Sequence, residues 1–163
     1  MNHIHRNYPA TKSVGVYTLV LQVKRHLSLS IGSLGRVNLV AGRYLYTGSA
    51  LGPGGLDSRL ARHLRKEKRV FWHIDYLTVD PCVDVSALVR SDCITRAECR
   101  VNKMLQSRLA AECTVPGFGS SDCGECLSHL LLAKDSEFGA LTKKIMDVYS
   151  EVGLNPSRKV FSN

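Results

Sequence analysis

A glycine-rich turn near residue 50 divides the first half of the chain into a strand-forming part and a helix-forming part. The turn, SALGPGG at residues 49–55, has three glycines that leave the backbone free and one proline that fixes a bend. After it, leucine recurs every fourth residue at Leu56, Leu60 and Leu64, which predicts a helix with one buried face. Before it, runs rich in β-branched and aromatic residues predict strands at 14–23, 27–31, 36–40 and 44–47. This order predicts an α+β fold with a small antiparallel sheet flanked by helices.

The remainder of the chain is predicted to be mainly helical. Its pattern predicts helices at 72–77, 95–111 and 138–149, one strand at 83–89 and a turn-rich loop at 116–126. The short apolar run at 129–133 fits either type. We expect three parts: a flexible N-terminus at 1–13, a core at 14–112, and a C-terminal extension at 113–163 that packs on the core.

The positive charge of the chain points to a polyanionic partner. The net charge is +8, and six of the 22 Lys and Arg residues fall between positions 59 and 69. Few aromatic residues are interleaved there, so phosphate contact rather than base stacking is expected. We expect DNA as the partner, although charge does not distinguish it from RNA. Four residues are predicted to form a solvent-facing docking surface for the nucleic-acid backbone: Arg62, Arg65, Lys66 and Arg69.

Other general properties predict a cytoplasmic protein with no membrane partner. A hydrophobic fraction of 44% is enough for a packed core and too high for disorder. No apolar run approaches the roughly 20 residues of a membrane-spanning helix. The first residues lack the apolar segment of a signal peptide. In a reducing compartment the six cysteines are not expected to form disulfides.

An arginine and a histidine four residues apart share one face of the predicted helix after the turn. Arg59 and His63 lie beside the leucine stripe, where a side chain is held firmly and can still reach a cleft. Taken singly, Tyr17 and Tyr46 are explained by packing in a sheet, and chemistry requires both hydroxyls in one cleft. Tyr44 shares a sheet face with Tyr46, so alternation does not choose between them.

A glutamate opens the apolar stripe of the predicted helix at 95–111. A carboxylate in this place is costly unless it is paired, hydrogen-bonded or bound to a cation, and Mg²⁺ suits a single carboxylate with several waters. The alternative is a capping box, Thr95 to Glu98, in which the carboxylate satisfies the helix terminus. Glu98 is therefore either a metal ligand or a helix cap.

Two cysteines and a histidine within seven residues form a candidate metal knuckle. Cys123 and Cys126 are separated by two residues, as in tetrahedral zinc sites, and His129 follows closely. The alternative is a turn with two unconnected thiols, and the other cysteines, at 82, 93, 99 and 113, are interpreted mainly as small core residues. The fourth ligand is open among Cys99, Cys113 and Asp122.

The order of these residues resembles the GIY-YIG nuclease superfamily. Gly15-Val16-Tyr17 is similar to its first motif, and Tyr46-Thr47-Gly48 to its second, with threonine in place of isoleucine. Arg59 and His63 match the arginine of the motif's helix and the residue four positions later, and Glu98 resembles the metal-binding glutamate.

A more specific resemblance runs through most of the chain. The strings YTGSALGPGGLDSRLARHLR, FWHIDYL and VPGFGSSDC are similar to an archaeal and bacterial branch of that superfamily. Some members of this branch are fused to endonuclease III-type repair glycosylases. The resemblance implies a core with a three-stranded antiparallel sheet flanked by helices, extended here by the hairpin at 26–40 and by the C-terminal segment.

The resemblance also implies a metal-dependent endonuclease that hydrolyses phosphodiester bonds in DNA. Such an enzyme would be structure-selective or repair-related, with DNA-repair proteins as partners and Mg²⁺ or Mn²⁺ as cofactor. The alternatives are a catalytically silent nucleic-acid-binding module and a zinc-stabilised adaptor of a repair protein. The implied roles are general base or water orientation for Tyr17, water or phosphate positioning for Tyr46, charge stabilisation for Arg59, proton relay for His63 and metal binding for Glu98.

Overall fold

The computed structural model describes residues 12–134 and 137–161, and within them the chain forms two antiparallel sheets and four α-helices. The predicted α+β class is confirmed. Most of the predicted flexible N-terminus, residues 1–11, lies outside the described residues. The strands are β1 Gly15–Val23, β2 Leu27–Ile31, β3 Gly35–Leu39, β4 Gly42–Ala50, β5 Val83–Asp92, β6 Leu130–Leu132 and β7 Ser157–Val160. The helices are α1 Gly55–Leu64, α2 His73–Thr78, α3 Glu98–Arg108 and α4 Phe138–Glu151.

The larger sheet has the strand order β6-β4-β1-β5-β7, and every neighbouring pair is antiparallel. Strand β1 is central and eight of its nine residues are buried, which fits its run of apolar residues without alternation. The three middle strands of this sheet, β4, β1 and β5, correspond to strands predicted from the sequence. The predicted hairpin forms as β2 and β3, but as a separate two-stranded sheet. The run at 129–133, whose type was open, contains edge strand β6, and the other edge strand, β7, was not predicted.

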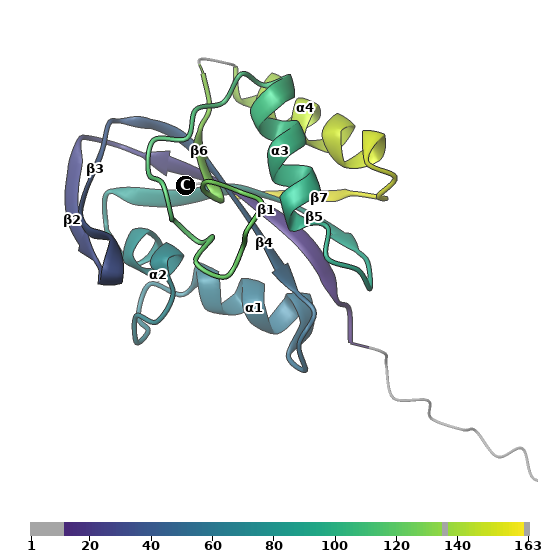
Figure 1. Cartoon of the computed structure of the whole chain (residues 1–163), viewed down its shortest axis with the longest axis horizontal. Helices are drawn as coiled ribbons and strands as arrows, with labels where there is room; N and C mark the ends of the chain where they lie inside the picture. Colours follow the sequence, from purple (N-terminus) through teal and green to yellow (C-terminus); the bar gives the residue numbers. More distant parts are fainter. Residues whose placement is uncertain (1–11, 135–136, 162–163) are drawn as a thin grey trace, which may run out of the picture.

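Two apolar cores lie on opposite faces of this sheet. Alternation along β1 sends Tyr17, Leu19 and Leu21 to one face and Val16 and Val20 to the other. The first core is closed by α1, α2 and the β2–β3 hairpin, and the second by α3 and α4. Figure 1 shows α1 and α2 set apart from α3 and α4. The loop before β6 also contributes Phe118 to the first core.

Two details of the predicted helices are wrong, and both concern the candidate site. Helix α3 begins at Glu98 rather than Thr95, because residues 95–97 do not adopt helical hydrogen bonding. Leu56 and Leu60 are buried as expected, but Leu64 is 38% exposed since α1 ends there. His63 takes the buried position instead. Within the described residues, no helix combines the length and apolarity needed to cross a membrane.

Candidate active site and metal centre

A pocket of about 450 Å³ lies between strands β1 and β4, helices α1, α2 and α3, and the loop before β6. Four of the five residues predicted to be catalytic line it: Tyr17, Tyr46, Arg59 and Glu98. The fifth, His63, lies behind Tyr17 and is 1% exposed. The fold thus brings together side chains separated by up to 81 positions of sequence.

Tyr17 and His63 are joined by a buried hydrogen bond of 2.7 Å between the phenol oxygen and Nε2. The other ring nitrogen, Nδ1, lies 3.9 Å from Oδ1 of Asp75, and neither atom has a hydrogen-bond partner among the described residues. Burial, together with nearby Lys68, lowers the pKa of His63 to about 3 and so keeps the imidazole neutral. A neutral ring with its proton on Nδ1 accepts the Tyr17 proton at Nε2.

Asp75 holds this part of the site together. Its Oδ2 accepts hydrogen bonds from Arg62 Nη2 at 2.6 Å and from the backbone N–H groups of Phe71 and Trp72, both at 3.0 Å. Lys68 Nζ lies 3.5 Å from Oδ1 and is only 3% exposed. Burial alone would raise the pKa of Asp75, but these hydrogen bonds and the Lys68 charge outweigh it and hold the pKa below its usual value.

Glycine at position 48 makes room for the Tyr17 ring. The two residues are opposite each other in the β1–β4 register. A Cβ atom at Gly48 would lie 2.6 Å from the Tyr17 hydroxyl oxygen and 2.7 Å from Cζ, so any side chain there displaces the ring. This contact explains why a glycine follows Tyr46-Thr47 in the second motif.

Gly48→Ala is therefore expected to lower the free energy of unfolding by about 1–3 kcal/mol, because overpacking forces Tyr17 away from His63. Urea unfolding measures the change. Gly52→Ala is the matched control, since a Cβ at Gly52 meets nothing within 4 Å, and it should change stability by less than about 0.5 kcal/mol. Equal effects of the two substitutions would contradict the proposed contact.

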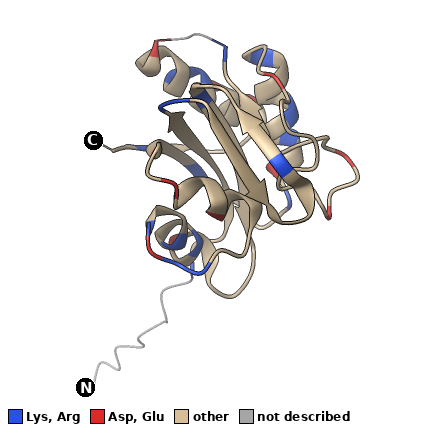
Figure 2. Cartoon of the chain, turned by 90° about the vertical axis from the view of Figure 1, so that its left-hand side faces the viewer, with Lys and Arg blue, Asp and Glu red and all other residues tan. Residues whose placement is uncertain are grey.

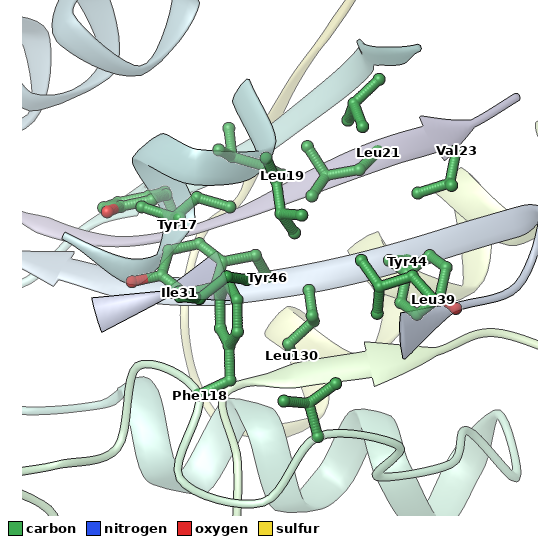
Figure 3. Close-up of a cluster of buried hydrophobic side chains, with 14 of the residues drawn as sticks. Tyr17, Leu19, Leu21, Val23, Ile31, Leu39, Tyr44, Tyr46, Phe118 and Leu130 are labelled. Atoms are coloured by element: carbon green, nitrogen blue, oxygen red, sulfur yellow. The ribbon is translucent and has the colours of Figure 1, made fainter. Parts of the chain in front are cut away.

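Tyr46, rather than Tyr44, faces the pocket. Figure 3 shows the hydroxyls of Tyr17 and Tyr46 at the same end of the core and that of Tyr44 at the opposite end. The Tyr44 hydroxyl donates to the backbone oxygen of Val40 at 3.1 Å. Burial raises the pKa of Tyr46 to about 12, so its hydroxyl stays protonated. A Cβ at Gly119 would lie 2.8 Å from Tyr46 Cε2, so the loop before β6 packs closely against this ring.

Arg59 places a guanidinium on the pocket wall without an ionic partner. Its Cζ lies 4.3 Å from the centre of the Trp72 ring, and no ion pair or hydrogen bond of its side chain is found within the described residues. Trp72 therefore holds the guanidinium by a cation–π contact and leaves its N–H donors available. Arg59 is the single Lys or Arg among the described residues that line the pocket.

Glu98 lines the pocket and has one carboxylate oxygen without a partner in the described part of the chain. Its Oε2 is buried and has no hydrogen-bond partner among the described residues. The capping-box alternative is wrong, because the N-cap of α3 is Ala97 and no side chain caps this terminus. A buried carboxylate oxygen without a partner carries a desolvation cost that a bound cation would remove. Asp122 supplies a second carboxylate to the lining.

The predicted docking surface is only partly exposed to solvent. Arg62 was predicted to face solvent, and this prediction is wrong. Its guanidinium binds Asp75 and lies 4.7 Å from the centre of the Trp72 ring. Lys66 is exposed, but its Nζ donates to the backbone oxygens of Asp80 and Val83. Arg65 and Arg69 are exposed as expected. Figure 2 shows Lys and Arg on other elements as well, so positive charge is not confined to the 59–69 segment.

Three cysteines and a histidine gather beside the pocket in an arrangement that can hold a metal ion. The ligand atoms of Cys99, Cys123, Cys126 and His129 all lie within 4.8 Å of one another. The Sγ atoms of Cys99 and Cys123 are 3.1 Å apart, and Cys99 Sγ is 3.8 Å from His129 Nε2. Of the three candidates for the fourth ligand, the structure therefore selects Cys99. The interpretation of Cys99 mainly as a small core residue does not hold, because Cys99 belongs to neither apolar core and joins this cluster.

This Cys₃His cluster adjoins the pocket. Cys99 directly follows Glu98 on α3, and His129 lines the pocket itself. Burial would raise the pKa of the Cys123 thiol, but hydrogen bonds from Cys99 and from the N–H groups of Glu125 and Cys126 hold it below its usual value. Burial raises the pKa of the Cys99 and Cys126 thiols, so the case for a metal ion rests on the geometry of the four ligand atoms.

Sequence reasoning missed several residues that shape the site. Asp75 and Trp72 lie in the string FWHIDYL, where a carboxylate inside an apolar run was a usable signal. Lys68 gave no such signal, because its burial depends on how the 65–71 segment folds back on α2. Phe71, just before α2, and His73, the first residue of α2, also line the pocket.

Comparison with known proteins finds one protein family, whose model matches most of the chain. No curated protein and no solved structure matches the sequence. The family described as a domain of unknown function, DUF123, matches residues 16–153, a span that contains every pocket residue named above. The chain therefore belongs to the DUF123 family.

Proposed function

We propose that the protein is a metal-dependent endonuclease of the GIY-YIG type that hydrolyses phosphodiester bonds in DNA. The observation that carries this proposal is the buried, unpartnered Oε2 of Glu98 in the same pocket as the unpaired guanidinium of Arg59. A cation-binding oxygen and an anion-binding guanidinium in one pocket suit a phosphodiester together with a divalent ion. A module that only binds nucleic acid has no use for a buried unsatisfied carboxylate.

The residues present fit a divalent ion. Glu98 would hold Mg²⁺ or Mn²⁺, and Asp122 is the other carboxylate on the pocket lining. A bound ion of this kind neutralises phosphate charge and increases the acidity of water. The chain's own contribution is to fix the carboxylates, because α3 holds Glu98 at its first turn against the apolar side of the helix.

The pKa directions favour water orientation over general-base catalysis for Tyr17. Burial raises the pKa of Tyr17 well above its usual value, and His63, whose pKa is near 3, is a weak acceptor for a fully transferred proton. When the His63 proton is on Nδ1, the phenol donates a hydrogen bond to His63 Nε2, and its oxygen lone pairs can accept a hydrogen bond from water. Tyr17 would thus orient the attacking water, while His63 orients Tyr17.

Arg59 and Tyr46 would act on the phosphate. The guanidinium of Arg59 has a fixed position on Trp72 and free N–H donors, which suit the negative charge that develops on the phosphorane oxygens. The Tyr46 hydroxyl remains protonated and donates a hydrogen bond to water or to a phosphate oxygen. Neither role requires a proton transfer from these groups.

A cleavage screen tests the proposal. Labelled duplex, nicked, branched and single-stranded DNA, with matched RNA, are incubated with the full chain in Mg²⁺, in Mn²⁺ and without divalent ions. We expect internal cleavage of at least one DNA substrate, only when a divalent ion is present. Binding to these substrates without cleavage in either metal would overturn the endonuclease and support the binding module instead.

We further propose that the ion held by the Cys₃His cluster is Zn²⁺. Three thiolates and an imidazole are soft and borderline ligands in the number that a structural zinc site requires. The ion would join the start of α3 to the loop that carries Cys123, Cys126 and His129. This arrangement also leaves room for the repair-protein adaptor as an additional role.

Cys126→Ser is expected to reduce bound zinc from about one ion per chain to nearly none, because three ligands hold zinc far less tightly than four. Elemental analysis of protein purified with zinc in the growth medium measures the content. Cys113→Ser is the control, since Cys113 lies outside the cluster, and should keep the full amount. Equal zinc in the two variants, or none in the parent chain, would exclude a structural zinc.

A further inference from the structure

We propose that the exposed ring of Phe71 is a stacking platform for an unpaired nucleobase next to the candidate active site. The inference rests on the proposed function, since it takes a nucleic acid as the substrate. It adds a preference that the chemistry alone does not supply: the strand must have at least one base outside a double helix beside the reacting phosphate.

Phe71 is an unusual residue for the surface that it occupies. Its side chain is 75% exposed, and it lines the pocket that also contains Tyr17, Arg59 and Glu98. Among the large apolar side chains exposed in the described part of the chain, it alone is aromatic and it alone borders this pocket. The others are Val40, Leu64, Ile94, Leu127 and Val160.

The local structure holds this ring in place although it is exposed. The backbone N–H groups of Phe71 and Trp72 both donate to Oδ2 of the buried Asp75. The Phe71 and Trp72 rings form a T-shaped pair, with ring centres 5.5 Å apart and planes at 84°. Because the backbone is fixed and the ring contacts Trp72, a base that stacks on the ring would lose little affinity to ordering it.

A phosphate-binding group lies one aromatic ring away. Phe71 contacts Trp72, and Trp72 carries the Arg59 guanidinium 4.3 Å from its ring centre. One nucleotide could therefore place its phosphate at Arg59 while a base beside that phosphate lies on Phe71. Stacking on an aromatic ring combined with a cationic group is the general mode by which proteins bind single-stranded nucleic acid.

A paired base could not use this platform. In a double helix the faces of each base are covered by its neighbours, so a protein ring stacks only on bases at ends, loops, gaps or single-stranded stretches. The sequence predicts phosphate contact rather than base stacking because residues 59–69 contain few aromatic side chains. Phe71 follows that segment directly and is returned to the pocket by the hydrogen bonds to Asp75.

Binding measurements without added divalent ions test the platform apart from catalysis. The parent and Phe71→Ala are each titrated with a short single-stranded DNA and with the same sequence inside a long duplex, in which end bases are a small fraction. We expect the substitution to weaken single-strand binding by about tenfold, the order of one lost stacked base, and duplex binding by less than about twofold. Trp72, the only tryptophan of the chain, reports occupancy by quenching of its fluorescence in each titration.

Two further variants make the result specific to stacking. Phe71→Tyr keeps an aromatic face and should bind single strands as the parent does. Ile94→Ala removes an apolar side chain that is 87% exposed and outside the pocket, and should have no effect. Equal losses on single strand and duplex, no loss on either, or a Phe71→Tyr variant as weak as Phe71→Ala would each overturn the platform. An absence of cleavage in metal would overturn the endonuclease while leaving this binding preference measurable.

Discussion

Replacing Glu98 with glutamine is expected to lower metal-dependent cleavage by at least about 10³-fold, a loss of ~4 kcal/mol of transition-state stabilisation. The buried Oε2 has no partner among the described residues, so its charge is the feature that a divalent ion would use. The same substitution should leave the free energy of unfolding unchanged or higher without metal, because the buried Oε2 has no hydrogen bond to lose among the described residues and carries less charge in the amide. Single-turnover cleavage and urea unfolding of one preparation measure both effects.

A loss of cleavage without a loss of stability distinguishes a functional carboxylate from a structural one. Glu151→Gln is the control, since Glu151 forms a surface ion pair with Arg108 at 2.7 Å, away from the pocket. It should change neither cleavage nor stability appreciably. If Glu98→Gln cleaves like the parent, or if it destabilises the chain as a lost helix cap would, Glu98 is not the metal ligand.

The sheet was predictable because the information for it is local. Runs rich in β-branched and aromatic residues mark its middle strands β1, β4 and β5 without reference to distant residues. The edge strands were not predictable in this way. Strand β7 is exposed at all four positions, so its sequence, SRKV, carries no burial pattern, and it exists because β5 offers a free edge.

The candidate site was predictable to the extent that its residues carry a motif. Tyr17, Arg59 and Glu98 were found from their order, and the structure brings them to one pocket. Asp75 was not assigned to the site, and Cys99 was one of three candidates for the fourth metal ligand, since each acquires its role only where distant elements meet. Asp75 contacts groups from α1 and from the 68–72 segment, and Cys99 joins a loop 24 residues away.

Asp75→Asn is expected to lower the free energy of unfolding by about 3–5 kcal/mol, the largest stability change that we predict for a single charge. The carboxylate is fully buried and faces Arg62 and Lys68, whose side chains are 24% and 3% exposed. Removing its charge leaves the Lys68 ammonium buried without a counter-ion. It also weakens the hydrogen bonds that fix Phe71 and Trp72, so Trp72 fluorescence should change as well.

Burial is the variable that this prediction isolates, because the chain offers a matched ion pair on its surface. Arg90 and Asp57 are also 2.6 Å apart, but the Asp57 side chain is 77% exposed, and Asp57→Asn should cost less than about 1 kcal/mol. The folded-state pKa of Asp75 is depressed, so its contribution is complete above the unfolded value of about 3.9 and is lost as pH falls through the folded pKa. The stability difference between parent and Asp75→Asn should therefore be constant near neutral pH and shrink below about pH 4. A difference that persists undiminished in strong acid, or that is no larger than that of Asp57→Asn, would mean that Asp75 acts through shape rather than charge.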